Sequence, residues 1–470
     1  MKNWGLCSQV IGSSQGSLCL DRRQFLQRSG TGFGLLSLAG LLDGRNTVRA
    51  AATTRPSSEA FFQAKAKRVI YIFAQGAPSQ VDTWDPKPEL TRRADQSLPG
   101  LGGVAMASPF TFARHGQSGI EVSQVFPKLA AHVDKMAVIR SMHTDIPAHD
   151  VATLFMNTGS LRMTKPSIGS WVLYGLGAEN ENIPGYVSLR PGGIPAGGVQ
   201  NWGSAFLPGN FQAASVSTRS ARVEDMLQNI KNPYITRTEQ RRQLDLAQKL
   251  NATRAAAMQQ DAQLEARIAA FEMAYRMQME ATDAFDITKE PASVRELYGD
   301  SAQGRQLLIA RRLAERGVRF IQVWAGGWDH HEDLQNRLSD SAQEIDQPAA
   351  ALLADLAQRG MLDSTLVVWG GEFGRTVTRD RNGGDDPGRD HNNRAFALWL
   401  AGGGVKGGTV HGATDEFGAR AVQDKVHVHD LHATLLHLLG MNHEKLTYRY
   451  NGRDFRLTDN FGNVVKNILS

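Results

Sequence analysis

Cysteine is almost absent from this sequence of 470 residues, which contains only Cys7 and Cys19. Both precede a pair of arginines in an N-terminal segment that we expect to be removed. A chain without them has no disulfide, no thiolate nucleophile and no cysteine-ligated zinc. Its stability must come from its core, and any metal site must use histidine and carboxylate ligands.

Charge of one sign is not in large excess either. The formal net charge is +5, but residues 1–52 hold six Lys/Arg against two Asp, which leaves 46 basic and 45 acidic residues elsewhere. Because a nucleic-acid partner requires a basic surface, we predict no nucleic-acid binding.

The N-terminal segment has the three parts of an export signal. A basic stretch, DRRQFLQ, precedes a small apolar run, GTGFGLLSLAGLL, and the small-residue stretch VRAAA follows and ends at Ala52. The apolar run is too short for a comfortable membrane span. Arg22 and Arg23, with a Phe-Leu pair shortly after them, resemble the twin-arginine signal, which exports folded proteins.

We therefore predict a twin-arginine signal over residues 1–52 that is cleaved near Ala52. The mature protein would be periplasmic or extracellular and would keep no stable membrane span. The alternative is an ordinary helix with a basic start.

Proline and glycine are absent from Thr236 to Glu290, a segment rich in Gln, Arg, Ala and Glu. An apolar stripe repeats there at three- and four-residue spacing: Leu264, Ile268, Phe271 and Tyr275. This pattern predicts a helix that packs on the flank of a domain. A dimer coiled coil is the weaker alternative because sustained heptads are absent. We predict a linker at 53–66 and one domain at 67–470, with a helical insertion at about 222–290.

Histidine is absent between Asp150 and Asp329, although the chain has thirteen histidines. This middle part looks like an insertion, and the two histidine-bearing ends look like halves of one catalytic fold.

Short apolar runs alternate with helical patterns along the rest of the chain. We predict strands at 68–76, late in 125–142, at 318–324, 364–375 and 395–404, and helices at 147–159, 305–316, 342–359 and 429–440. This alternation favours an α/β protein with a mostly parallel central sheet and helices on both faces. Ligands of such sheets bind beyond the carboxyl ends of the strands.

Four predicted strands end in side chains of the metal-ligand or nucleophile type. They are Asp82 and Asp85, then Ser141, His143, Thr144, Asp145 and His149, then Asp329, His330, His331, Glu332 and Asp333, and finally Glu372 and Arg375 with Asp390 and His391 shortly after. Histidine and carboxylate without thiolate suit a divalent ion such as Zn, Ca or Mn.

The stretch IQVWAGGWDHHED, residues 321–333, carries the densest of these groups. Its Gly-Gly pair lets the backbone turn tightly after a strand. Asp329 and His331 are two residues apart, so on an extended segment both point the same way, and His330 points elsewhere. This spacing predicts two ligands of one metal ion.

Several motifs resemble a known family. GAPSQVDTWDPKP, GGWDHHED, GEFGRT, GRDH and AGGGVKGGTVHGATDE, with HDLHATLLHLLG after them, are similar in order and content to an uncharacterised, twin-arginine-exported, sulfatase-like family. That family lies within the alkaline phosphatase superfamily, and the resemblance covers roughly residues 67–442. It implies a three-layer αβα sandwich whose sheet carries one or two metal ions. It also implies hydrolysis of phosphate or sulfate esters by a metal-activated Ser, Thr or formylglycine, of which formylglycine is excluded without cysteine.

The resemblance also implies residue roles. Asp329 and His331 match an Asp/His ligand pair, and His391 falls where a late ligand histidine is expected. Ser141 or Thr144 falls where a nucleophile would begin a helix, and the spacing leaves both open.

The sequence departs from the superfamily pattern in two places. Gln75-Gly76 stands where Asp-Gly is usual after the first strand, so Asp82 would have to fold back to supply the carboxylate. Glu372, in GGEF, stands where an Asp-His pair is usual, which removes an imidazole from the second metal position.

We therefore predict an exported, metal-dependent hydrolase of sulfate or phosphate esters that acts on a small anionic ester or sulfated glycan. The candidate residues are Asp82, Asp329, His331, Glu372, Asp390 and His391 for one or two metal ions, and Thr144, Ser141 and Arg375 for catalysis. Arg375 would hold the anion bidentately, or else form a structural salt bridge. The alternative function is a non-catalytic binding or structural protein on a degenerate alkaline phosphatase-like fold.

Overall fold

The computed structural model describes residues 56, 61–227, 234, 236–257, 275 and 282–470. Within these residues the central sheet has nine strands. Eight follow the order β14 (Thr409–His411), β6 (Met136–His143), β13 (Phe396–Ala401), β10 (Thr365–Gly370), β1 (Arg68–Ala74), β9 (Phe320–Ala325), β7 (Tyr186–Arg190) and β8 (Ala214–Ser217), and β17 (Val426–His427) also pairs with β6. Only β13 in this sheet runs antiparallel to its neighbours, β10 and β6. The prediction of a mostly parallel sheet is confirmed.

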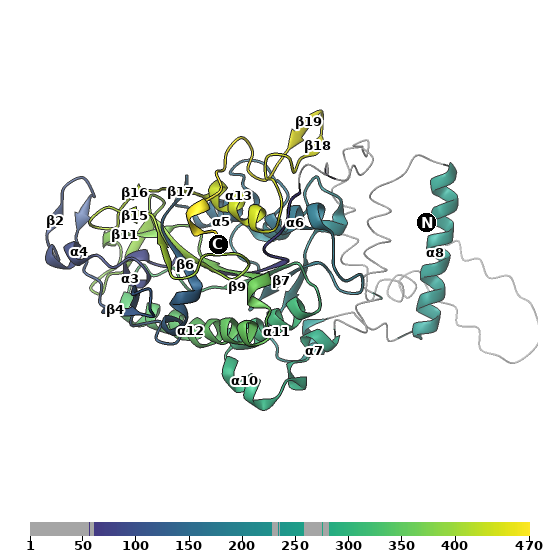
Figure 1. The fold of residues 1–470 in the computed structure, drawn as a ribbon, viewed down its shortest axis with the longest axis horizontal. Coiled ribbons are helices and arrows are strands. Elements are labelled where there is room, and N and C mark those ends of the chain that lie inside the picture. Colours follow the sequence, from purple (N-terminus) through teal and green to yellow (C-terminus); the bar gives the residue numbers. More distant parts are fainter. Residues whose placement is uncertain (1–55, 57–60, 228–233, 235, 258–274, 276–281) are drawn as a thin grey trace, which may run out of the picture.

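Helices cover both faces of the sheet (Figure 1). One face carries α5 (His149–Thr158), α6 (Ile168–Leu176) and α13 (Val428–Leu438), and the other carries α11 (Ala302–Glu315) and α12 (Leu334–Gln358). Strand β1 shows why, because all but its first residue are buried and they alternate between two cores. Tyr71 and Phe73 pack in the core under α5, α6 and α13, whereas Ile70 and Ile72 pack under α11 and α12. The structure is therefore the predicted three-layer α/β sandwich.

Shorter elements surround these layers. The helices are α3 (Gln80–Thr83), α4 (Pro88–Arg92), α7 (Val223–Met226), α8 (Arg237–Ala257) and α10 (Ala292–Tyr298). The paired short strands are β2 (Ser97–Leu98) with β3 (Gly103–Val104), β4 (Phe112–His115) with β5 (Ile120–Ser123), β11 (Gly374–Arg379) with β12 (Arg389–Asn392), β15 (Ala413–Thr414) with β16 (Ala421–Gln423), and β18 (Tyr448–Tyr450) with β19 (Arg453–Phe455).

The histidine-free middle of the chain is not an insertion as a whole, which corrects the interpretation from histidine placement. It contributes β7 and β8, which extend the sheet in parallel beyond β9, and α6 and α11, which lie on opposite faces. Val187 and Leu189 of β7 are buried in the core. Histidine placement therefore does not mark the limits of an insertion, because membership of the sheet follows apolar burial.

The predicted helical insertion is described only in part. Helix α8 lies within it, and Arg241 of α8 places its guanidinium 5.6 Å from the ring centre of Tyr275. Leu264, Ile268 and Phe271 lie outside the described residues, as do the export signal and residues 53–55 and 57–60 of the linker. The boundaries of the insertion, the linker and the signal stay predictions. Among the described residues, no helix combines the length and apolar character needed to cross a bilayer.

Candidate metal centre

The loops after three central strands meet at one edge of the sheet. Gly76 follows β1 and has a φ of +107°, and a Cβ atom there would lie 2.6 Å from the backbone nitrogen of Asp329, which follows β9. The backbone nitrogen of Gly76 donates to Oε1 of Glu372, which follows β10, at 3.0 Å. Only glycine allows so close an approach. Gly76 therefore joins the three loops, although no carboxylate precedes it.

A hairpin formed by β11 and β12 brings the next residues to the same edge. Arg375 in β11 lies directly opposite His391 in β12. The backbone nitrogens of Gly388 and Arg389 donate to the carbonyls of His331 and His330, at 2.8 and 3.0 Å. The predicted strand at 364–375 is thus two elements, because β10 ends at Gly370 and the chain then turns into the hairpin.

Three histidines at this edge each have Nδ1 placed on a fixed oxygen. Nδ1 of His149 lies 2.6 Å from Oε1 of Glu372, and Nδ1 of His331 lies 2.5 Å from Oδ2 of Asp380. Nδ1 of His391 lies 2.9 Å from the carbonyl oxygen of Pro147. Since these oxygens accept hydrogen bonds, each Nδ1 carries a proton, and each ring presents a lone pair at Nε2 whenever it is neutral. Histidines that ligate metals are held in this way.

The three Nε2 atoms converge on one carboxylate oxygen. Oδ1 of Asp329 lies 3.2 Å from Nε2 of His149, 2.9 Å from that of His331 and 3.5 Å from that of His391. Nε2 of His331 also lies 3.0 Å from Nε2 of His391. Two lone pairs at that distance repel each other unless a proton or a metal ion lies between them.

The ligand atoms form two overlapping groups, each compact enough for an ion. One group is His149, Asp329 and His391, and the other is His331, Asp390 and His391. Imidazole and carboxylate ligands suit Zn²⁺ or Mn²⁺. The side chain of Asp329 is 47% exposed, so solvent reaches the centre. The residues present therefore fit a divalent metal ion, and the prediction of a metal-ligand cluster at the strand ends has a structural basis.

The charges of the cluster are strongly coupled. Burial alone would raise the pKa of Asp329, but hydrogen bonds from His149, His391 and Arg375 lower it far below the usual range. Burial alone would lower the pKa of His149, but hydrogen bonds to Asp329 and Glu372 raise it to about 9. Without an ion, His149 is therefore protonated at neutral pH, and an ion that binds there must displace this proton.

Arg375 lies beneath the cluster with its side chain 1% exposed. Its Nη2 donates to Oδ1 of Asp329 at 2.5 Å, and its other N–H groups point at backbone carbonyls and at Nε2 of His331. The prediction that Arg375 holds a substrate anion is not supported, because no donor is left for one. The contacts of Arg375 agree with the alternative prediction, a structural salt bridge.

Asp82 does not join the cluster. Its side chain is fully buried, and Arg389 donates to both of its oxygens, from Nε at 2.6 Å and from Nη2 at 3.1 Å. The hydroxyl of Ser79 lies 2.5 Å from the same carboxylate. The proposed replacement for the missing first-strand carboxylate is therefore wrong, since a buried guanidinium already neutralises Asp82.

Neither predicted nucleophile lies at a helix N-terminus. Ser141 is inside β6, where its hydroxyl donates to the carbonyl of Asp424 at 2.6 Å. The hydroxyl of Thr144 is buried and has no hydrogen-bond partner among the residues that the structure describes. Helix α5 begins at His149 after Ala148, so neither hydroxyl caps it. The expectation that one of them begins a helix is corrected.

The remaining predicted ligands take different positions. Glu372 is fully buried and supports His149 rather than facing the centre, whereas Asp390 is exposed and its Oδ1 accepts from the backbone nitrogen of His391 at 2.7 Å. His330 points away, as predicted, with Nε2 3.2 Å from the hydroxyl of Ser341. Burial and the charge of Arg375 lower the pKa of His330 to about 4.

Sequence reasoning missed two members of the centre. His149 was among the strand-end residues but was not predicted as a ligand, although it begins the helix that follows the second strand. Asp380 follows β11 and reaches His331 only because the hairpin folds back, and no sequence spacing signals that contact.

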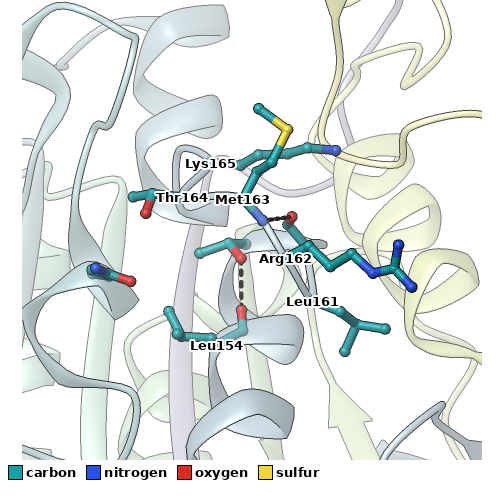
Figure 2. Close-up of a pocket in the computed structure, with 9 residues that line it drawn as sticks. Leu154, Leu161, Arg162, Met163, Thr164 and Lys165 are labelled. Carbon is teal, nitrogen blue, oxygen red and sulfur yellow. Dashed lines mark hydrogen bonds between the residues drawn. The ribbon is translucent and has the colours of Figure 1, made fainter.

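A separate pocket lies farther along α5 (Figure 2). It is lined by Leu154, Thr158, Ser160, Leu161, Arg162, Met163, Thr164, Lys165 and Gln200. Figure 2 shows Lys165 extending away from Thr164, and its Nζ pairs with Oδ2 of Asp459 at 2.8 Å. None of these lining residues belongs to the metal centre.

The fold and the site define an α/β protein with a candidate metal centre at the carboxyl ends of its parallel strands. A family model described as "Protein of unknown function (DUF1501)" matches residues 66–469. The chain therefore belongs to this family. No curated protein sequence is detectably similar to it.

Several solved structures resemble the chain at a distance. A lipoteichoic acid synthase from Listeria monocytogenes is 10% identical, with 86% of this chain and 77% of that chain covered and a TM-score of 0.36. A sulfatase from Pseudoalteromonas is 12% identical over 89% and 72% of the two chains, with a TM-score of 0.37. A phosphonate monoester hydrolase from Silicibacter pomeroyi is 12% identical over 80% and 73%, with a TM-score of 0.33.

Proposed function

We propose that this protein is an exported, metal-dependent hydrolase of phosphate or sulfate esters. The observation that carries the proposal is the convergence of three anchored imidazoles on Oδ1 of Asp329. A histidine cluster that only stabilised the fold would not need all three Nε2 atoms to face one exposed carboxylate.

The residues of the centre divide into two sets. His149, Asp329 and His391 would hold the ion in one arrangement, and His331, Asp390 and His391 would hold it in the other. Glu372, Asp380 and the carbonyl of Pro147 hold the rings in the required tautomer. When bound, the ion would polarise the ester and stabilise the charge that develops on the transferred group.

The attacking group in this proposal is a water molecule. Ser141 is fully buried and bonded to a backbone carbonyl, and Thr144 is 4% exposed. Neither hydroxyl contacts the ligand atoms, whereas the exposed side of Asp329 is open to solvent. A small anionic ester or the sulfate group of a glycan could approach from that side.

Two variants in the same loop test the proposal. Asp329→Asn keeps the shape of the side chain but removes its charge, so we expect metal content and turnover of aryl phosphates and aryl sulfates both to be lost. Glu332→Gln is the matched control, because the side chain of Glu332 is exposed and pairs with Arg337 at 3.2 Å. This control should keep both properties.

Two outcomes would count against the proposal. If Asp329→Asn kept its metal content and its turnover, the assigned centre would be wrong. If the metal-loaded parent turned over none of the esters, the non-catalytic binding protein would be the better description.

A further inference from the structure

Arg375 is enclosed by oxygen atoms from three separate segments, and its Nη1 also lies 3.3 Å from Nε2 of His331. Its Nε donates to the carbonyl of Ala77 at 2.9 Å, and Nη1 donates to that of Arg389 at 3.1 Å. Its Nη2 donates to the carbonyl of Gly76, to that of Trp328 at 3.4 Å and to Oδ1 of Asp329 at 2.5 Å.

Five oxygens, one of them charged, are the ligand set that hard cations such as Ca²⁺ take in proteins. The guanidinium thus fills a cation cage. Its burial lowers the pKa of Arg375, but the side chain stays charged because an arginine does not deprotonate in proteins.

The neighbouring ligand groups have room for only one ion at a time. His391 belongs to both groups, and its Nδ1 is already used on the carbonyl of Pro147. That leaves one lone pair, at Nε2, which can bind one ion. Filling one group therefore takes His391 from the other.

Asp329 already carries one positive charge. Oδ1 of Asp329, the oxygen nearest the three Nε2 atoms, accepts from Nη2 of Arg375. A positive charge that belongs to the chain therefore lies beside the oxygen that would bind the ion.

We propose that the guanidinium of Arg375 is the second cation of this centre, fixed to the chain, so that the centre takes one exchangeable metal ion rather than two. Asp329 joins the two charges through Oδ1. Arg375 is then a positioning residue that sets the metal count, and it does not touch substrate. This inference rests on the proposed metal site but not on turnover.

The first test is the metal count of the wild-type chain. Metal-free protein is titrated with Zn²⁺ and its bound metal is measured by elemental analysis after removal of free ions. We expect one equivalent per chain even at excess metal. Two tightly bound equivalents would overturn the inference and would leave the proposed hydrolase intact. One equivalent without turnover would support the inference and weaken the hydrolase.

The second test is chemical rescue. Arg375→Ala empties the cage, so we expect its Zn²⁺ affinity to fall by about tenfold or more, as for other groups that orient ligands. Millimolar guanidinium should restore most of that affinity by entering the cage. Urea, which has a similar planar shape but no charge, should not.

A matched control is Arg311→Ala. Arg311 is also fully buried, but it lies on α11 and pairs with Glu290 and Asp355. This variant should lose stability without any guanidinium-dependent change in Zn²⁺ affinity. If urea rescued Arg375→Ala as well as guanidinium did, charge would be irrelevant and the inference would be wrong. Should Arg375→Ala fail to fold, the wild-type metal count alone still decides.

Discussion

Two groups of histidines lie among the described residues, and of these two only one has the arrangement of ligand atoms that suits a metal ion. In the metal centre, His149, His331 and His391 each have Nδ1 on an acceptor and Nε2 near Asp329. In the second group His427, His429 and His432 lie at and after the start of α13, with His143 beside His427. The rings of this second group also neighbour one another, with centres 5.1 to 6.1 Å apart from one to the next, against 4.3 and 4.8 Å in the metal centre.

The ring nitrogens of the second group have different neighbours from those of the metal centre. Nε2 of His432 lies 2.8 Å from the carbonyl of Met156, and its Nδ1 is buried without a partner. Nδ1 of His429 is also buried without a partner, and its ring stacks on Phe461. Burial lowers the pKa of His429 to about 3 and that of His432 to about 4. A dense set of histidines therefore predicts a metal site only where hydrogen-bond acceptors fix the Nδ1 atoms and a carboxylate faces the Nε2 atoms.

Removing one histidine from each group should give the largest contrast. We expect His391→Ala to lower Zn²⁺ affinity by more than about a hundredfold, because second-layer partners alone are worth ~10–100-fold. His432→Ala should leave that affinity unchanged and lower only the melting temperature. Titration of metal-free protein by calorimetry measures both. Equal losses of affinity in the two variants would remove the distinction between the groups.

Replacing an acceptor that holds one of the histidine rings should have the next largest effect on Zn²⁺ affinity. Asp380→Asn replaces the carboxylate at Nδ1 of His331 by an amide that can donate instead, which favours the tautomer with a proton on Nε2. Zn²⁺ affinity should fall by about tenfold. In the second group, Asp145 lies 3.2 Å from Nε2 of His427, and Asp145→Asn should leave Zn²⁺ affinity as it was. If Asp380→Asn kept its Zn²⁺ affinity, the acceptor at Nδ1 of His331 would not control metal binding.

The smallest effect we expect is a difference between the two histidine groups in how they make the stability of the protein depend on pH. In the metal-free protein the pKa of His149 is raised from 6.5 to about 9, so its contribution to stability is complete below pH 6.5 and is lost as the pH rises through 9. The lowered pKa values of His429 and His432 act in the opposite sense. Their contribution to stability is complete above pH 6.5 and is lost as the pH falls towards 3 for His429 and 4 for His432.

Melting curves of metal-free protein between pH 4 and 10 measure this difference. His149→Gln should flatten the alkaline side of the profile, and His432→Gln should flatten the acid side. If each substitution flattened the other side, the protonation states assigned to the two groups would be exchanged.

Much of the fold follows from local features of the sequence. β1, β9 and β10 could be predicted because each is a short apolar run that ends at Gly or Pro, and their parallel pairing follows from the helices between them. β7 and β8 were missed because they are only five and four residues long and lie among Gly- and Pro-rich stretches.

The site was harder to predict because its contacts depend on tertiary pairing. Asp329, His331 and His391 were predicted from strand ends, and the structure brings them together. Asp82 and Arg375 looked like functional residues, but burial gives each of them partners within the protein. Pairs such as Asp82 with Arg389 join distant parts of the sequence, and composition and spacing do not encode them.

The position of the ligands on distant segments gives the ion a mechanical role. His149 begins a helix in the first third of the chain, whereas His391 lies in a hairpin near its C-terminal end. An ion bound by both would cross-link these segments as a disulfide does, but reversibly. Because the unfolded chain lacks this arrangement, an ion present at a hundred times its dissociation constant would add ~2.7 kcal/mol to the free energy of unfolding. If the signal is cleaved as predicted, the mature protein has no cysteine, and the ion would then supply a cross-link whose strength depends on the metal supply of its surroundings.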